Sequence, residues 1–340
     1  MELNFETSSG VKVVRHWGYQ LQSSGGKDGR GKAKPLDIED LSRQPHDLIV
    51  IDATKDGTFA HSFTRAEVQR LKDRPGAQSV VVSYISIGEA SDYRDHWQDN
   101  WTTYTDPDQR AAGELTEHAP KWLGAWNEQW PNSRKVRYWD PDWQKIIFNN
   151  DKTGWLDRIV AAGFDGAYLD IVLGYYHWGT EVAGSATSHP GDPRNEFEAA
   201  QRMIDFIGAM GAHARKTNPD FIIIPQNGAF IIDALEDEDH ARRDAYLEAI
   251  QAIACEDLFF RGDKIENNPF APDEEAIDAL SRDFLEPGIA VLAVDYVNDR
   301  RKVQKLYEAA TAKGFLPYAA PKRELNVMGP AYDGSGEAVA

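Results

Sequence analysis

The sequence predicts an α/β fold that forms a single (β/α)8 barrel, and three observations lead to this prediction. Eight short apolar runs are spaced along the 340-residue chain. Patterns typical of amphipathic helices lie between most of these runs. The runs are nearly continuous rather than alternating with polar residues, which is typical of parallel strands buried on both faces. Strands of this kind that alternate with helices predict a parallel sheet, and eight is the number that closes such a barrel.

The eight expected strands are rich in β-branched or aromatic residues, and polar residues follow each of them. They cover 11–17, 48–53, 79–87, 165–171, 221–225, 249–255, 289–294 and 315–319. Helices are expected where apolar residues recur at spacings of three and four, over 63–72, 143–162, 196–216, 274–285 and 299–313. No Pro/Gly/Ser-rich break divides the chain. We therefore expect one barrel domain over 11–320, an N-terminal tail at 1–10 and a C-terminal tail at 321–340.

Residues 89–142 form a long connection after the third expected strand and hold six of the ten tryptophans. We expect a Trp-rich insertion at the carboxyl face of the barrel, where long loops commonly build the ligand site. Indole rings suit the apolar faces of sugar rings. Large aromatic residues are also common in protein cores, so both roles remain open for each tryptophan.

The charge balance argues against a nucleic-acid partner, and the lack of a long apolar run argues against a membrane span. Lys and Arg number 37 against 55 Asp and Glu, so the net charge is −18. A surface that binds a phosphate backbone is typically basic, whereas an acidic protein more easily accommodates a cationic or neutral ligand. No apolar run reaches the roughly 18 residues that a membrane span requires. No obligate protein partner is indicated.

Motifs of several common enzyme classes are absent. The single cysteine, Cys255, excludes an intrachain disulfide and a CxxC redox or metal site. The nine histidines form no HExxH motif and no pair at helical ligand spacing, and no GxSxG nucleophile motif is present. We therefore expect no metal and no cofactor. Carboxylates at strand ends remain the candidate catalytic groups.

Two acidic residues stand where expected strands end. Asp170 closes one apolar run, and Glu256 follows another, with aromatic residues after each. Catalytic groups of a barrel sit at the carboxyl ends of its strands. Glycoside hydrolysis uses such a pair, because one carboxylic acid protonates the leaving oxygen while the other carboxylate attacks or activates water. Either residue alone could instead cap a helix or order a loop.

Other polar residues, most of them at expected strand ends, are candidates for the same cleft. A hydroxyl-rich ligand needs many oriented polar contacts. Each candidate could also have a purely structural role. We predict substrate-binding roles for Tyr19, Gln20, Asp52, Tyr84, Glu89, Arg94, Trp139, Asn227, Asp295 and Tyr296.

Seven ordered segments resemble glycoside hydrolase family 114, the family of endo-α-1,4-polygalactosaminidases. They are 17–21, 49–53, 83–94, 136–143, 163–170, 225–228 and 256–260. The family's catalytic Asp, which follows its GFDG segment, falls on Asp170, and its catalytic Glu falls on Glu256. The resemblance implies a TIM barrel that cleaves α-1,4-linked galactosamine polymers without a cofactor.

Such a polysaccharide is a cationic amino-sugar polymer when deacetylated, and the negative net charge agrees in sign. Family members are usually exported, which implies a secreted or periplasmic protein whose signal peptide has been removed. We expect Asp170 as nucleophile and Glu256 as general acid/base, with net retention of anomeric configuration, because the shorter Asp side chain stays fixed below the anomeric carbon. The alternatives are a barrel that binds polysaccharide without cutting it, a glycosidase for another sugar polymer, and an amino-sugar deacetylase.

Overall fold

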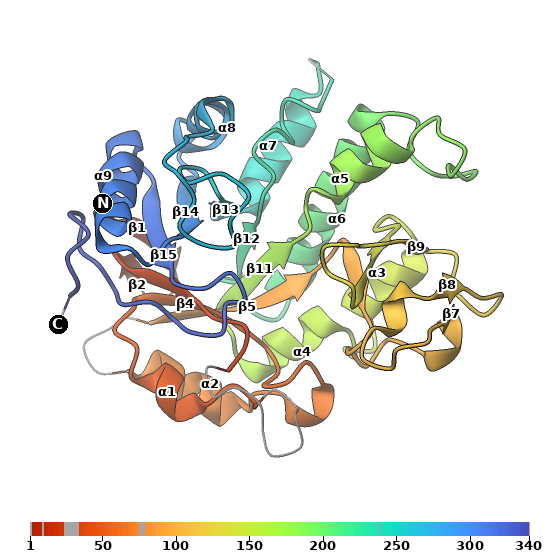
Figure 1. The fold of residues 1–340 in the computed structure, drawn as a ribbon, viewed down its shortest axis with the longest axis horizontal. Coiled ribbons are helices and arrows are strands. Elements are labelled where there is room, and N and C mark those ends of the chain that lie inside the picture. The colour runs from red at the N-terminus through yellow and green to blue at the C-terminus, as the bar shows by residue number, and fades with distance from the viewer. Residues whose placement is uncertain (1, 9, 24–33, 75–78, 237, 340) are drawn as a thin grey trace.

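The computed structural model describes residues 2–8, 10–23, 34–74, 79–236 and 238–339. Over these residues it shows an α/β fold with eight parallel strands in the middle and helices around them (Figure 1). The parallel strands are β3 (Trp17–Tyr19), β4 (Leu48–Asp52), β5 (Val80–Ser86), β11 (Gly166–Asp170), β12 (Ile222–Pro225), β13 (Ala252–Glu256), β14 (Ala290–Tyr296) and β15 (Leu316–Ala320).

These strands form two hydrogen-bonded sheets, with the orders β12-β11-β5-β4-β3 and β13-β14-β15. A parallel bridge between Gln226 and Ala254 places β13 beside β12. Between β15 and β3 the described residues show no backbone hydrogen bond. Instead, the rings of Trp17 and Tyr318 pack 5.2 Å apart at this junction. The α/β part of the prediction is confirmed, but the barrel is not closed by a continuous ladder, because side chains rather than backbone join its last and first strands.

The first parallel strand is shorter and begins later than the predicted strand at 11–17. Most of that range belongs instead to β2 (Gly10–Val14), which pairs antiparallel with β1 (Leu3–Thr7). β1 lies within the segment expected to be an N-terminal tail. Burial of Leu3 and Phe5 but not of the residues between and after them is the pattern of a hairpin with one covered face. Only β3 continues into the parallel sheet beside β4.

Two hydrophobic clusters account for the continuous apolar runs. Side chains alternate across a strand, so successive residues of β4, such as Ile49 and Val50, belong to different clusters. The inner cluster contains Val50, Tyr168 and Leu292. The outer cluster contains Ile49 together with helix residues such as Leu71. Burial on both faces removes the polar alternation that an exposed sheet would show.

Helices cover the outer faces of the strands (Figure 1). The helix predicted over 143–162 is two helices, which residues 148–154 separate. Gly154 lies just before the second helix, and a Cβ atom there would lie 2.5 Å from the Ile147 carbonyl oxygen. The helices are α1 (Ile38–Ser42), α2 (Arg65–Lys72), α3 (Pro141–Ile147), α4 (Trp155–Ala162), α5 (Gly174–Tyr176), α6 (Glu196–Arg215), α7 (His240–Ala249), α8 (Glu274–Leu280) and α9 (Arg300–Lys313). Shorter helical segments are Phe59–His61, Asp99–Trp101, Arg110–Ala112, and two π-helical turns at His177–Val182 and Ser281–Leu285.

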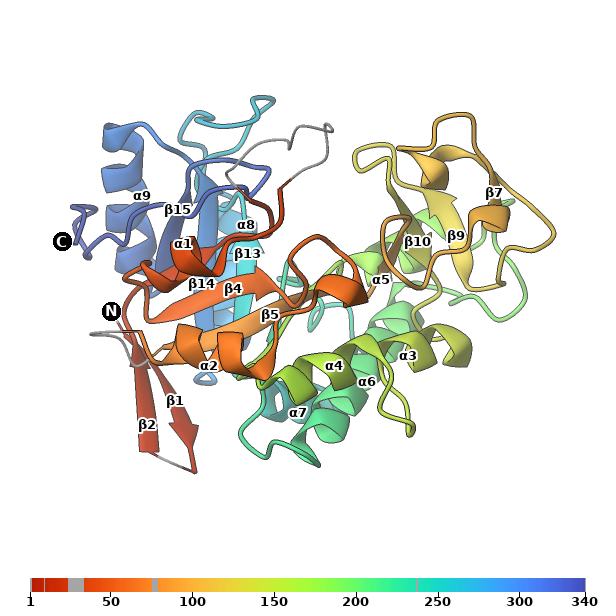
Figure 2. The ribbon, with the colours of Figure 1, turned by 90° about the horizontal axis from the view of Figure 1, so that it is seen from below.

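The segment after β5 folds into short antiparallel strands that lie beside α3 and α5 (Figure 2). Trp97, Trp101 and Trp122 are buried and pack ring against ring toward Trp143. These three tryptophans are therefore core residues, which is the second of the two roles that the sequence left open for them. The strands are β6 (Glu89–Ser91), β7 (Thr102–Thr103), β8 (Glu114–Leu115), β9 (Leu123–Trp126) and β10 (Ser133–Val136).

Candidate active site

Both predicted carboxylates are the last residues of parallel strands. Asp170 ends β11, where it pairs with Ser86 of β5. Glu256 ends β13, where it pairs with Val294 of β14. Strand β12 lies between β11 and β13. Neighbouring strands are about 4.8 Å apart, so the axes that carry the two acids are separated by roughly 10 Å. Side chains can close that distance.

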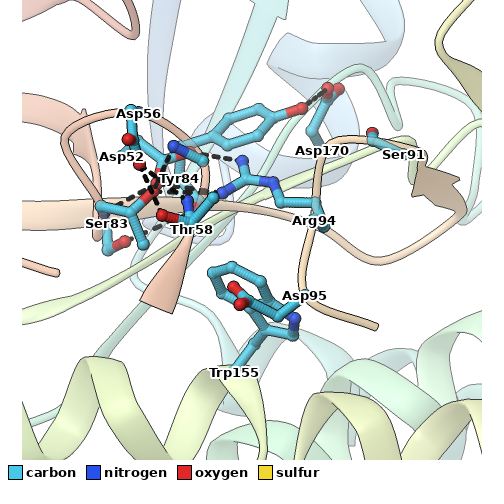
Figure 3. Close-up of polar contacts among 12 residues, drawn as sticks. Asp52, Asp56, Thr58, Ser83, Tyr84, Ser91, Arg94, Asp95, Trp155 and Asp170 are labelled. Atoms are coloured by element: carbon cyan, nitrogen blue, oxygen red, sulfur yellow. Dashed lines mark hydrogen bonds and ion pairs between the residues drawn. The ribbon is translucent and has the colours of Figure 1, made fainter. Parts of the chain in front are cut away.

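The carboxylate of Asp170 receives a hydrogen bond at each oxygen. The Tyr84 hydroxyl donates to Oδ2 at 2.7 Å, and the backbone N–H of Ile171 donates to Oδ1 at 2.7 Å. Figure 3 shows the Tyr84 side chain pointing at Asp170. Burial, with the charge of Glu256 second, raises the pKa of Asp170 to about 7. The side chain is thus poised between its two protonation states near neutral pH.

Glu256 is held in the same way by groups from two other strands. Tyr296 donates its hydroxyl to Oε1, and the Asn227 amide donates to Oε2 at 2.8 Å. The backbone N–H of Glu256 in turn donates to Asn227 Oδ1 at 2.9 Å. Burial raises the pKa of Glu256, and the hydrogen bonds from Tyr296 and Asn227 oppose that rise. Each acid therefore has a tyrosine hydroxyl and a second donor that fix its orientation.

Three residues at these strand ends adopt left-handed backbone conformations although none is glycine. The φ angles are 61° at Ile171, 61° at Asn227 and 53° at Asp257. Such conformations are strained, above all for a β-branched residue such as Ile171, and they concentrate at functional sites. The chain therefore turns sharply next to both carboxylates, at a cost that the surrounding packing must offset.

Tyr19 and Tyr168 pack together beneath the site, with ring centroids 5.0 Å apart. Burial raises the pKa of both hydroxyls well above the usual value, and the charges of Asp170 and Glu256 add to it. Both tyrosine hydroxyls are thus close enough to interact electrostatically with Asp170 and Glu256. We did not identify Tyr168 from the sequence, although it lies two residues before Asp170 and so shares its face of the strand.

Comparison with known proteins decides the family. Residues 4–337 match the model of glycoside-hydrolase family GH114. The protein belongs to this family. It is 34% identical over 332 residues to an uncharacterized protein, MJ1477, of Methanocaldococcus jannaschii, covering 95% of this chain and 80% of that relative. It is 31% identical over 313 residues to an uncharacterized Thermotoga maritima protein, covering 90% and 80%.

The fold of this GH114 protein is also similar to solved glycoside hydrolases. The glycoside hydrolase domain of PelA from Pseudomonas aeruginosa superposes with a TM-score of 0.55 at 17% identity, covering 92% of this chain and 97% of that domain. Amy13B of Eubacterium rectale superposes with a TM-score of 0.50 at 10% identity, covering 92% of this chain and 68% of that protein. At these identities the likeness concerns the fold alone.

Two predicted substrate-binding residues pair with each other instead of standing free. Both terminal nitrogens of Arg94 donate to the Asp52 carboxylate. Thr54 donates to Asp52 as well, through its backbone N–H at 2.8 Å and its hydroxyl at 2.6 Å. The Arg94 guanidinium lies 4.8 Å from the Trp155 ring and beside Tyr84 (Figure 3). This ion pair supports the strand-end region from which Tyr84 reaches Asp170.

Glu89 and Trp139 are also engaged within the protein. Glu89 is buried and accepts hydrogen bonds from Lys135 at 2.5 Å and from the Asn127 amide at 2.8 Å. Trp139 packs against Trp178 with ring centroids 5.3 Å apart. Contacts of this kind orient the loop after β5, and direct binding of substrate by these two side chains stays a prediction.

Gln20 and Asp295 hold loops in place. The side chain of Gln20 accepts a hydrogen bond from the Met328 backbone at 3.1 Å, so it anchors the segment after β15. Asp295 is fully buried, and its Oδ1 accepts hydrogen bonds from the backbone N–H groups of Phe259 at 3.1 Å and Phe260 at 2.7 Å. Both side chains are buried, and direct binding of substrate by either of them stays a prediction.

Sequence reasoning missed Arg323, which lies in the segment expected to be a C-terminal tail. Its Nη2 donates to Asp257 Oδ1 at 2.7 Å, and its guanidinium carbon is 3.9 Å from the centre of the Tyr296 ring. Nothing in the local sequence marks this arginine. Arg323 comes close to Glu256 only because the chain returns past the ends of β13 and β14.

A small cavity lies behind Tyr84 and includes Ser86, Glu89 and Arg94 in its lining. Its volume of about 20 Å³ admits a single water molecule but no sugar ring. The described ranges contain no group of three or more His, Cys, Asp or Glu side chains arranged to hold a metal ion, and no helix in them is long and apolar enough to cross a membrane.

We predict that Gly88→Ala damages the site through its backbone. An added Cβ would lie 2.6 Å from Ile171 Cγ2 and still closer to the Ile171 carbonyl oxygen, next to Asp170. We expect a loss of roughly 1–3 kcal/mol in stability and a displaced Asp170, measured by thermal unfolding and by turnover. Gly208→Ala, where no atom lies within 4 Å of the added Cβ, is the matched control. Unchanged stability in Gly88→Ala would contradict the clash.

We also predict that Asp295→Asn becomes relatively more stable as pH rises. Burial, with Asp257 contributing, raises the pKa of Asp295 to about 7 from an ordinary value of about 3.9. The wild-type carboxyl therefore stabilises the fold fully below pH 4, and this stability is lost as pH rises through 7. The free energy of unfolding of the variant, measured against wild type, should gain up to about 4 kcal/mol between pH 4 and 8. The exposed Asp244→Asn should show no such trend, and a flat difference for Asp295→Asn would refute the shift.

Proposed function

We propose that this GH114 protein hydrolyses an α-1,4-linked galactosamine-containing polysaccharide, with Asp170 and Glu256 as its catalytic carboxylates. One observation carries the proposal. Two acids end strands on either side of β12, and a tyrosine hydroxyl and a second donor orient each of them. Glycoside hydrolysis needs two oriented carboxyl groups of this kind. The family match supplies the class of bond that they cleave.

In this proposal Asp170 is the nucleophile. It attacks the anomeric carbon while the glycosidic oxygen leaves, and a covalent glycosyl ester forms. The short Asp side chain is held at both oxygens by Tyr84 and by the backbone of Ile171, which suits a group that must stay fixed. The strained turn at Ile171 sets the direction from which the carboxylate projects.

Glu256 is the general acid/base of the proposal. It protonates the departing oxygen and then takes a proton from the water that hydrolyses the ester, so the product keeps the configuration of the substrate. Tyr296 and Asn227 hold its two oxygens through their side chains. Burial raises the pKa of Glu256, which favours the protonated form that the first step requires.

Protonation of Asp170 also bears on the substrate. A nucleophile must be ionised, yet in the free protein burial and the nearby Glu256 raise its pKa to about 7. A cationic sugar amine bound near Asp170 would lower that pKa and favour the carboxylate. The net charge of −18 likewise favours a cationic polymer as the partner. We extend the proposal to an exported protein, because such polymers are encountered outside the cytoplasm.

We predict that incubation with partly deacetylated α-1,4-galactosaminan yields shorter oligomers, which mass spectrometry detects. Three results are distinguishable in that one assay. Shorter chains support the proposal, and an α-anomer seen first by proton NMR supports retention. Binding without new products would instead indicate a polysaccharide-binding barrel. Loss of acetyl groups without chain cleavage would indicate a deacetylase.

We predict that Asp170→Asn and Glu256→Gln each lower turnover at least about 10³-fold, on the order of 4 kcal/mol in the barrier. The amides keep the volume of the acids but cannot ionise or donate a carboxyl proton. Circular dichroism should show that both variants remain folded, and the exposed Asp244→Asn serves as control. Activity within about tenfold of wild type would remove that residue from the mechanism.

Azide rescue separates the two roles. With an activated α-aryl glycoside, azide should enter the space left by Asp170→Gly and give a β-glycosyl azide, because it replaces the nucleophile directly. With Glu256→Ala, azide should replace water in the second step and give an α-glycosyl azide. The opposite pair of products would exchange the roles assigned to the two acids.

A further inference from the structure

Arg323 is held on three sides next to the proposed acid/base. Its Nη2 donates to Asp257 Oδ1 at 2.7 Å, and its Nε donates to the Ile265 carbonyl oxygen at 3.1 Å. The guanidinium carbon lies 3.9 Å from the centre of the Tyr296 ring. A guanidinium over the face of a tyrosine is attracted by the ring and covers it. Arg323 therefore restrains both Tyr296 and the residue that directly follows Glu256.

The backbone that carries Arg323 is also anchored. The Leu325 carbonyl oxygen accepts hydrogen bonds from the backbone N–H groups of Leu21 at 2.8 Å and Gln22 at 3.1 Å. Gln20 accepts a further bond from Met328. The segment after β15 is thus tied to the loop after β3, on the same side of the molecule as the strand ends. The arginine is part of a built arrangement rather than of a loose tail.

We propose that Arg323 is a positioning residue for Glu256, which it holds through Tyr296 and Asp257. The inference rests on the acid/base role proposed for Glu256. The Tyr296 hydroxyl donates to Glu256 Oε1, so a ring that Arg323 keeps in place keeps that hydrogen bond in place. The ion pair with Asp257 fixes the left-handed residue that begins the turn after β13.

The positioning role of Arg323 can be measured through the protonation of Glu256, because charged groups around Glu256 change its pKa. The groups that face it are Tyr296 of β14, Asn227 after β12, Asp170 and Tyr168 of β11, Tyr19 of β3, and the neighbouring Asp257 and Arg323. Burial is the main cause that raises the pKa of Glu256. The charge of Asp257 adds to the rise, whereas the charge of Arg323 opposes it. Removing one or the other charge should therefore move the protonation of Glu256 in opposite directions.

The test measures the protonation of Glu256 in the whole chain without substrate. The infrared band of the protonated carboxyl is followed against pH, and the spectrum of the same protein carrying Glu256→Gln is subtracted. We expect the midpoint, the pH at which half of Glu256 is protonated, to rise by roughly 0.5 to 1 pH unit in Arg323→Gln and to fall by a similar amount in Asp257→Asn. Arg323→Lys keeps the charge but loses the planar group that covers Tyr296 and pairs with Asp257. It should keep the midpoint near wild type and still lower kcat about tenfold or more, with KM unchanged.

Arg300→Gln is the matched control, because it removes an ion pair between α9 and Glu337 of the same C-terminal segment. It should move neither the midpoint nor kcat. Midpoints that stay constant, or that move in the same direction in Arg323→Gln and Asp257→Asn, would overturn the proposal. Failure of the polysaccharide assay would leave this titration readable, since no substrate enters it. The two proposals can therefore fail independently.

Discussion

The parallel strands are buried on both faces, and the rest of the structure is built around this constraint. An inner cluster that includes Val50, Tyr168 and Leu292 fills the space between the strands, and an outer cluster joins the strands to the helices. A strand covered on both sides carries most of its polar side chains near its ends, because a buried polar group without partners is costly. The carboxyl ends of β5, β11, β13 and β14 are where such side chains gather.

The candidate site lowers the stability of the fold. Asp170 and Glu256 lie in surroundings that disfavour their charged forms, and three residues next to the strand ends adopt strained left-handed conformations. Costs of this kind are typical of active sites and are sustained by the packing of the surrounding fold. Here the support includes the buried Arg94–Asp52 pair beside Tyr84 and the fully buried Asp295 under the loop after β13. Several side chains that were predicted to bind substrate thus also make contacts within the protein, and some of these contacts support the two proposed catalytic carboxylates.

The electrostatics of the site and of the whole molecule act in the same direction. The chain has an excess of acids, and the charges of Glu256 and Glu89 add to the burial that raises the pKa of Asp170. A cationic ligand relieves that repulsion, whereas an anionic one increases it. Arg323 is a local exception, because its positive charge lies beside Glu256 and is paired with Asp257. Under the proposed function, the acids of the site favour a cationic substrate, while Arg323 places one positive charge of the protein itself beside Glu256.

The sequence by itself determined seven of the eight parallel strands, several of the helices around them and the two carboxylates at strand ends, because these depend on local hydrophobic patterns and on where an apolar run stops. The sequence also indicated the family, because seven short segments resemble it in the same order along the chain. The tertiary structure decided what depends on contacts between distant residues. It placed 10–14 in an antiparallel hairpin, buried Trp97, Trp101 and Trp122, joined Asp52 to Arg94 and brought Arg323 to Tyr296. Local periodicity does not encode these pairings, because each one depends on which surfaces meet in the packed fold, and the Asp52–Arg94 and Tyr296–Arg323 contacts also join residues that are tens of positions apart.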